Sequence, residues 1–154
     1  MPLLKLFGSD FAPALEEPLQ EVSLEDWCDN PQAHADATAL VIENDIGVEH
    51  FAEDLSSFRI IILNFPTFKD GRAYSQARLL RERFGYTGEI RARGDVLRDQ
   101  ALFMVRCGFD AFEFADEDAA AATAALAEFS FAYQPAADRA EPVWRRRLDR
   151  PAAA

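Results

Sequence analysis

Cysteine and histidine are scarce in this chain, which limits the metal and redox chemistry available to it. The 154 residues include only two cysteines, Cys28 and Cys107, and two histidines, His34 and His50. No histidine lies at metal-ligand spacing from a cysteine, and the cysteines form neither a CxxC pair nor an iron–sulfur cluster motif. The sequence therefore predicts no metal site, and it argues against a structural disulfide.

Long apolar runs and phosphate-binding motifs are also missing. No run approaches the roughly 20 apolar residues that a membrane-spanning helix needs. The first residues, MPLLKLFGSDF, lack the basic start and the small-residue cleavage site of a signal peptide. Neither GxGxxG nor GxxxxGK[ST] occurs, and no Ser/His/Asp arrangement suggests itself. We therefore expect a cytoplasmic protein that does not enter a membrane, and no cofactor is evident from the sequence.

Positive charge is scarce overall but concentrated in one stretch. The formal net charge is −11. Residues 1–58 contain thirteen acidic residues and one lysine, whereas residues 59–106 contain ten basic residues and five acidic ones. The negative total disfavours nucleic-acid binding, because phosphates would be repelled. The basic stretch indicates either an anion site or an internal network of salt bridges.

What the sequence does contain is an alternation of apolar strands and amphipathic helices. We expect strands at 37–43, 59–65, 89–93 and 111–114, and helices at 48–55, about 72–84, 96–107 and 119–131. Right-handed crossovers then predict an α/β fold with about four parallel strands. Four strands are too few for a closed barrel, so an open three-layer sandwich or a half-barrel-like sheet remains.

Both ends of the chain lack a clear hydrophobic period. Residues 1–36 are predicted to form a loosely docked arm and a short helix that Ser23 can cap, and residues 37–134 form the α/β domain. Residues 135–154 form a tail with three prolines and five arginines. The simplest interpretation is a solvated tail. The alternative is an arm whose Trp144 packs on a neighbouring subunit, which would make the protein a homo-oligomer.

The strand at 89–93 has an unusual pattern. In EIRAR, Glu89, Arg91 and Arg93 point to one face of the sheet and two apolar residues point to the other. A strand inside a parallel sheet is normally apolar on both faces. The pattern therefore indicates either an edge strand protected by charge or a polar cleft lined by arginines.

Ligands of parallel α/β sheets bind beyond the carboxyl ends of the strands. At those ends the sequence places Asn64, Lys69, Arg72, Arg93 and Asp95, which could gather around a small oxyanion or phosphate. The simpler interpretation is that Asp95 caps a helix and that Arg72 pairs with a nearby carboxylate. The full set of candidate ligand-binding residues is Asn64, Lys69, Arg72, Tyr74, Arg91, Asp95 and Gln100.

Three further residues have competing interpretations. Tyr74 and Gln100 lie one turn into helices that follow such loops and could reach the same cleft, but a tyrosine there is more often part of the core. Cys107 lies in the last turn of its helix, where the helix dipole raises a thiol pKa. We therefore do not expect Cys107 to act as a nucleophile.

The run FPTFKDGRAYSQARLLRERFGYTGEIRARGDVLRDQALFMVRCGFDAFEF, together with FSFAYQP at 129–135, resembles an uncharacterised bacterial family. Members of that family are typically encoded beside sulfite reductase and labelled "probable oxidoreductase" in sulfur assimilation. The resemblance covers roughly residues 38–147 and rests on FPxFxDGRxYSxARLLR and GDVLxDQ. The positions that match are Phe65, Pro66, Asp70, Gly71, Arg72, Tyr74, Ser75, Arg78, Arg91, Gly94, Asp95, Asp99, Gln100, Arg106 and Cys107. Arg93 departs from the family pattern, in which position 93 is a small apolar residue.

The resemblance implies a place in assimilatory sulfite reduction. It implies an accessory protein that docks on sulfite reductase or on its electron donor, and only the family label implies an oxidoreductase activity. The residues leave two alternatives open. One is an enzyme or sensor that binds a small anion or a nucleotide at the strand ends. The other is a homo-oligomeric structural domain.

Overall fold

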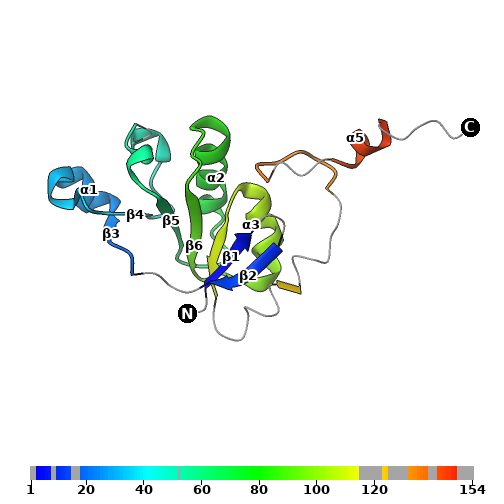
Figure 1. Ribbon diagram of the computed structural model, residues 1–154, viewed down its shortest axis with the longest axis horizontal. Helices are drawn as coiled ribbons and strands as arrows, with labels where there is room; N and C mark the ends of the chain where they lie inside the picture. The colour runs from blue at the N-terminus through cyan, green and yellow to red at the C-terminus, as the bar shows by residue number, and fades with distance from the viewer. Residues whose placement is uncertain are drawn as a thin grey trace, which may run out of the picture.

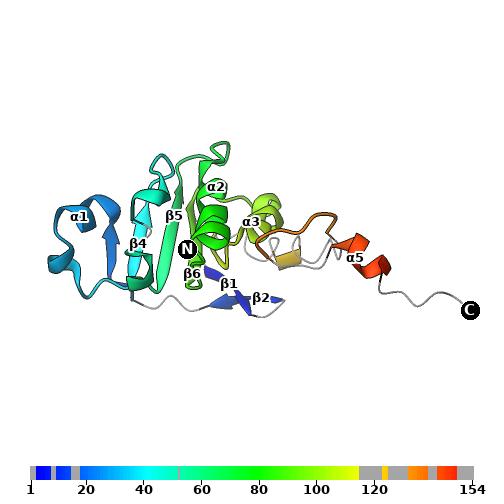
Figure 2. The same cartoon turned by 90° about the horizontal axis from the view of Figure 1, so that it is seen from above.

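Seven strands form a single sheet in the order β2-β1-β7-β6-β5-β4-β3 (Figures 1 and 2). The computed structural model describes residues 3–7, 10–14, 18–51, 53–114, 123–124, 132–138 and 142–148. The strands are β1 (Leu3–Phe7), β2 (Asp10–Ala14), β3 (Glu21–Ser23), β4 (Ala39–Ile42), β5 (Ile60–Phe65), β6 (Glu89–Gly94) and β7 (Ala111–Glu113). The helices are α1 (Leu24–Asp29), η1 (Pro31–His34), η2 (Val48–Phe51), η3 (Leu55–Ser57), α2 (Arg72–Arg78), η4 (Leu79–Arg83), η5 (Arg98–Gln100), α3 (Ala101–Cys107) and α5 (Val143–Leu148).

The strands from β3 to β7 are parallel and follow one another across the sheet in sequence order. The four strands expected from the sequence are β4 to β7, so the open α/β sheet is confirmed. The structure adds a fifth parallel strand, β3, beside β4. The sheet does not close into a barrel, since β2 and β3 stand at its two ends.

The N-terminal arm differs from the loosely docked segment that we expected. β1 pairs antiparallel with β7 and β2 pairs antiparallel with β1, and the main chain of β1 thus bonds a strand more than 100 residues away. Leu3 and Leu4 are buried by this pairing. The pairing partner lies far along the chain and β2 contains Pro13, so local periodicity carries little sign of these strands.

The helices that contribute to the main core pack on one face of the sheet. Alternate strand residues such as Leu40, Ile61 and Ile90 belong to the same buried cluster as Leu24 of α1 and Met104 of α3. A smaller cluster on the opposite face contains Ala39, Ile60 and Ile62. Strands added in sequence order with right-handed crossovers place every connecting helix on the same face, which explains this arrangement. Figure 2 shows α1, α2 and α3 following the strands across the molecule.

Local sequence signals correctly predicted where several helices begin or end. Ser23 caps α1, because its hydroxyl accepts the Asp26 amide proton at 3.1 Å. Gly108 ends α3 with a φ of 110°, a left-handed conformation that glycine adopts without strain. The start of α3 was wrong: residues 98–100 form η5, α3 begins at Ala101, and Asp95 does not cap a helix.

Two other segments also differ from the prediction. The expected helix at 48–55 is divided into two short 3-10 helices, η2 and η3. The C-terminal tail contains α5, which lies apart from the sheet in both ribbon views. The expected helix at 119–131 lies outside the described residues, apart from the helical residues 123 and 124.

Candidate functional site

The carboxyl ends of β5 and β6 meet side by side. Asn64 is in register with Arg93, and Phe65 is in register with Gly94. Gly94 has a φ of 102°, and a Cβ at this position would lie 2.3 Å from the carbonyl oxygen of Phe65. Only glycine permits this close approach. The loops that follow the two strands therefore begin at the same edge of the sheet.

Asp95 and Gln100 hold the backbone of Phe68 in the loop between β5 and α2. The Asp95 carboxylate accepts the Phe68 amide proton at 2.9 Å, and the Gln100 side-chain amide donates to the Phe68 carbonyl at 3.0 Å. Two side chains that follow β6 thus bind the amide and the carbonyl of one residue in the neighbouring loop. Asp95 and Gln100 are positioning residues in this arrangement.

Phe68 and Phe103 are exposed although they are large and apolar. Their exposed fractions are 37% and 58%. The ring of Tyr74 lies between the core and this surface, with centroid distances of 5.4 Å to Phe65 and 5.0 Å to Phe103. Burial raises the pKa of Tyr74 to about 12. Gln100, directly before α3, holds the loop that carries Phe68, and we call Phe68, Tyr74 and Phe103 the aromatic patch.

Lys69 and Arg72 lie in the loop that carries Phe68 and at the start of α2. The Lys69 ammonium is 5.6 Å from the centroid of the Phe68 ring. Arg72 forms a two-point ion pair with Asp70, with Nε–Oδ1 and Nη2–Oδ2 distances of 3.0 and 2.7 Å. The hydrogen bonds from Arg72 hold the pKa of Asp70 well below its usual range. The expectation that Arg72 pairs with a nearby carboxylate is confirmed.

Asn64 is the strand-end residue that faces away from the helices. Its side-chain amide donates to the Glu43 carboxylate at 2.9 Å. Glu43 follows β4, so this bond links the ends of β4 and β5. Asn64, Lys69, Arg72, Asp95 and Gln100 thus lie at one edge of the sheet, which we call the rim.

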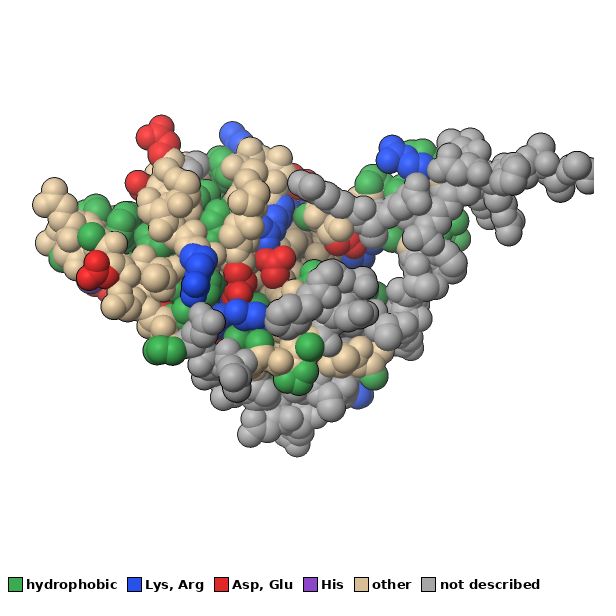
Figure 3. Space-filling view, viewed as in Figure 1, with side chains coloured by type: hydrophobic (Ala, Val, Ile, Leu, Met, Phe, Trp, Pro, Cys, Tyr) green, Lys and Arg blue, Asp and Glu red, His purple; other side chains and the backbone are tan. Residues whose placement is uncertain are grey.

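Arg91 lies away from the rim, in the middle of β6 and on the face opposite the helices. It is buried and pairs with Glu89 at 2.7 Å and with Glu113 at 3.4 Å. Arg93 pairs with Glu113 and Glu21, both at 2.7 Å, and Lys5 pairs with Glu89 at 2.8 Å. We call these six residues the charge ladder; Figure 3 shows acidic and basic side chains adjoining near the middle of the molecule.

The position of β6 excludes one of the two interpretations of the strand at 89–93. β6 is the fourth of seven strands, so the edge-strand interpretation was wrong. The six residues come from four different strands, and three cations meet three carboxylates, which makes the ladder electrically balanced. Hydrogen bonds to Glu21 and Glu113 raise the pKa of Arg93, and the same contact lowers the pKa of Glu21. Part of the basic stretch is therefore an internal salt-bridge network.

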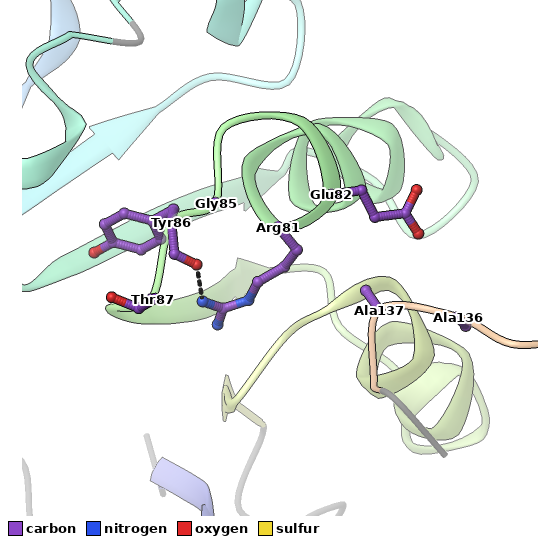
Figure 4. A pocket seen from close by; sticks show the side chains of 7 residues that line it. All are labelled: Arg81, Glu82, Gly85, Tyr86, Thr87, Ala136 and Ala137. Atoms are coloured by element: carbon purple, nitrogen blue, oxygen red, sulfur yellow. Dashed lines mark hydrogen bonds between the residues drawn. The ribbon is translucent and has the colours of Figure 1, made fainter. Parts of the chain in front are cut away.

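A hollow of about 560 Å³ lies at the amino end of β6, away from the rim (Figure 4). The residues that line it are Arg81, Glu82, Gly85, Tyr86, Thr87, Ala136 and Ala137. Arg81 donates to the carbonyls of Tyr86 and Gly88 at 2.7 and 2.8 Å and to that of Gly108 at 3.0 Å, and it pairs with Asp110. Its guanidinium is thus engaged in joining the turn at 86–88 to the ends of α3 and β7.

The thiol of Cys107 is buried, and burial raises its pKa. This direction agrees with the sequence-based expectation, and burial is its largest cause. Among the described residues no group of three histidine, cysteine, aspartate or glutamate side chains is placed to hold a metal ion. No described helix is long and apolar enough to cross a membrane.

The sequence missed the aromatic patch and most of the charge ladder. Phe103 lies outside the inward-facing stripe that contains Ala101 and Met104. Its exposure could have been predicted from that position. No comparable signal existed for Glu21, Glu113 or Lys5, because their partners on β6 are distant in sequence.

Comparison with known families identifies the chain by its central region. A family model for bacterial proteins of unknown function, DUF934, matches residues 39–144. The chain belongs to the DUF934 family. The match begins at β4 and includes the rim, the aromatic patch and α3, whereas β1, β2 and β3 precede it. A search of curated proteins found no match to the chain.

Proposed function

We propose that the protein is an accessory docking protein of assimilatory sulfite reduction, and that the aromatic patch is its contact surface. The observation that supports docking is the exposure of Phe68 and Phe103 on a loop and a helix that are held in place. Aromatic side chains that are exposed in the free protein and rigidly positioned are typical anchors of protein interfaces. The link to sulfite reduction is supported by the resemblance of the FPxFxDGRxYSxARLLR and GDVLxDQ motifs.

The polar residues of the rim favour docking over catalysis. Asp95 and Gln100 are engaged with the Phe68 backbone, Asn64 with Glu43, and Arg72 with Asp70. Side chains that already form such bonds have fewer donors and acceptors left for a substrate. Their contacts instead fix the position of the surface that Phe68 presents.

Rigidity of the Phe68 loop is what makes its exposed ring effective. A flexible aromatic side chain loses conformational entropy when it binds, and this loss weakens the complex. The two hydrogen bonds to the Phe68 backbone remove part of that loss before binding. A partner surface then gains the apolar contact of the ring at a lower entropic cost.

Binding measurements with the cognate sulfite reductase and its electron donor test this proposal. Phe68→Ala and Phe103→Ala should each weaken binding by at least tenfold, since an aromatic anchor is worth roughly 2 kcal/mol. Tyr133→Ala is the matched control, because Tyr133 is 84% exposed and lies outside the patch. Equal binding by all three variants would exclude the patch as the contact surface.

A genetic experiment tests the pathway separately from the surface. A strain that lacks this protein should reduce sulfite more slowly than the parent strain. Sulfite reduction at the native rate would remove the proposed role in that pathway and would leave the docking surface open to another partner.

The second candidate function is binding of a small anion or a nucleotide at the rim. The observation that favours it is Arg72, whose guanidinium reaches both Asp70 and the Asn44 side chain. The carboxylates nearby oppose a highly charged ligand, so a nucleotide polyphosphate is disfavoured relative to a small anion. A thermal-shift screen over anions and nucleotides tests this candidate, and the absence of any shift would eliminate it.

A further inference from the structure

The donors around Asp70 form a set that matches a carboxylate. Both oxygens of Asp70 accept from Arg72, through Nε at 3.0 Å and Nη2 at 2.7 Å, and the Arg72 backbone amide adds a contact of 3.3 Å. The Asn44 amide lies close enough to this carboxylate to help lower the pKa of Asp70, but no hydrogen bond of normal length joins its Nδ2 to Asp70. A guanidinium fork combined with an amide donor recognises paired oxygens on one ligand.

Asn44 is buried without using its donor. Its exposed fraction is 6%, its Oδ1 accepts from Arg72 at 3.5 Å, and its Nδ2 has no hydrogen-bond partner. An unpaired buried amide is costly, and proteins retain such groups where a ligand or water completes them. The unused donor therefore marks a place for one more acceptor oxygen.

Gln76 fixes the position of Asn44. Its Nε2 donates to the carbonyls of Glu43 and Ile46, each at 2.8 Å, and these two residues flank the turn that begins with Asn44. Gln76 is itself 5% exposed. The turn that carries Asn44 is thus anchored to α2, the same helix that begins with Arg72.

From these contacts we propose that Asn44 and Arg72 form a binding site for a small oxyanion, with the carboxylate of Asp70 occupying the ligand position in the free protein. The ligand is an anion with two to four oxygens on one centre, such as a carboxylate, sulfite or sulfate. The Arg72 side chain is 57% exposed, which makes the site accessible from solvent. This inference specifies the site of the second candidate function above, and it does not depend on docking because its residues lie outside the aromatic patch.

Local charge explains why Asp70 controls the site. Asp45 also lies near enough to act on Arg72, so the surroundings are already negative. With Asp70 in place, an incoming anion meets a neutralised arginine and a nearby carboxylate. When Asp70 is removed, Arg72 regains an unpaired positive charge beside the free Asn44 donor.

The test compares sulfite, sulfate and acetate with chloride at matched ionic strength, using calorimetry and melting temperature. Asp70→Ala should bind sulfite at least tenfold more tightly than the wild-type protein, and adding Arg72→Ala should abolish the gain. Asn44→Leu in the Asp70→Ala background should reduce it. Different responses to sulfite and acetate would identify which oxyanion geometry the site prefers.

Glu82→Ala is the matched control. It leaves Arg78 unpaired after loss of a comparable exposed ion pair at 3.1 Å, without an adjacent buried amide. An equal gain in anion affinity by Glu82→Ala and Asp70→Ala would overturn the proposal, and so would no gain by Asp70→Ala. If Asp70→Ala does not fold, Asp70→Asn must bind sulfite more tightly than wild type for the site to stand.

Discussion

Neutralising Glu113 should destabilise the protein far more than neutralising an ordinary surface carboxylate. Glu113 is buried in β7 and accepts from Arg93 at 2.7 and 3.0 Å and from Arg91 at 3.4 Å. Glu113→Gln preserves the shape of the side chain but leaves two arginines with one fewer negative charge. The lost charge lies at the centre of the charge ladder. Because Glu113 is buried, little water can solvate the two arginines in place of the missing carboxylate.

The size of this effect follows from the remaining partners. Removing one member of a fully buried ion pair costs about 3–5 kcal/mol. Arg93 keeps Glu21 and is 30% exposed, and Arg91 keeps Glu89, so the expected loss is smaller, about 2–3 kcal/mol. For a chain of this length, that loss corresponds to a fall in melting temperature of roughly 5–10 °C.

Urea denaturation followed by circular dichroism measures the difference. Glu82→Gln is the matched control, because Glu82 pairs with Arg78 on the exposed face of one helix and should cost about 0.5 kcal/mol or less. If the two variants lose the same stability, the charge ladder stabilises the fold no more than an exposed ion pair does.

Three further changes have defined expected outcomes. Arg81→Lys loses most of the guanidinium's hydrogen bonds to three carbonyls and should lower the free energy of unfolding, measured by denaturation, by about 2–4 kcal/mol. The control Arg83→Lys, at an exposed position, should lower it by less than about 0.5 kcal/mol. Gly94→Ala should lower the free energy of unfolding by about 2–3 kcal/mol, because the new Cβ would clash with the Phe65 carbonyl and the backbone φ is positive. Gly85→Ala, with a φ of 64° and open space around it, should cost about 1 kcal/mol. The lowered pKa of Glu21 means that its stabilising contribution is present above its ordinary pKa of 4.5 and is lost as pH falls through the lowered value. Glu21→Gln should therefore flatten the decline in melting temperature below about pH 4.5, and an unchanged profile would contradict this assignment.

Much of the central sheet was predictable because β4 and β5 are apolar along almost their whole length. The run RIIILNF identified β5. Gly85 identified the end of the helix that follows β5. The pairing of Arg72 with a carboxylate was also accessible, since Asp70 lies two residues away. These predictions succeed because the relevant contact is local or because burial on both faces requires continuous apolar sequence.

The contacts of Asp95 could not be predicted in the same way. Its position after β6 is that of a helix cap, but its carboxylate bonds to Phe68 across the neighbouring loop. A side chain that can satisfy a nearby or a distant amide takes the one that the fold brings closer. The first helical turn then begins further along, at η5 and α3.

The sequence by itself determined the class of fold, the alternation of strands with helices and the placement of Asn64 and Asp95 at strand ends. Only the tertiary structure decided that β6 lies in the interior, that β1 joins β7, and that Arg91 and Arg93 meet carboxylates from two other strands and their own. The physical reason is that strand periodicity specifies which face a side chain occupies but not which strand lies beside it. Neighbouring strands are chosen by long-range pairing, and that choice turned an apparently unpaired row of charges into a balanced network.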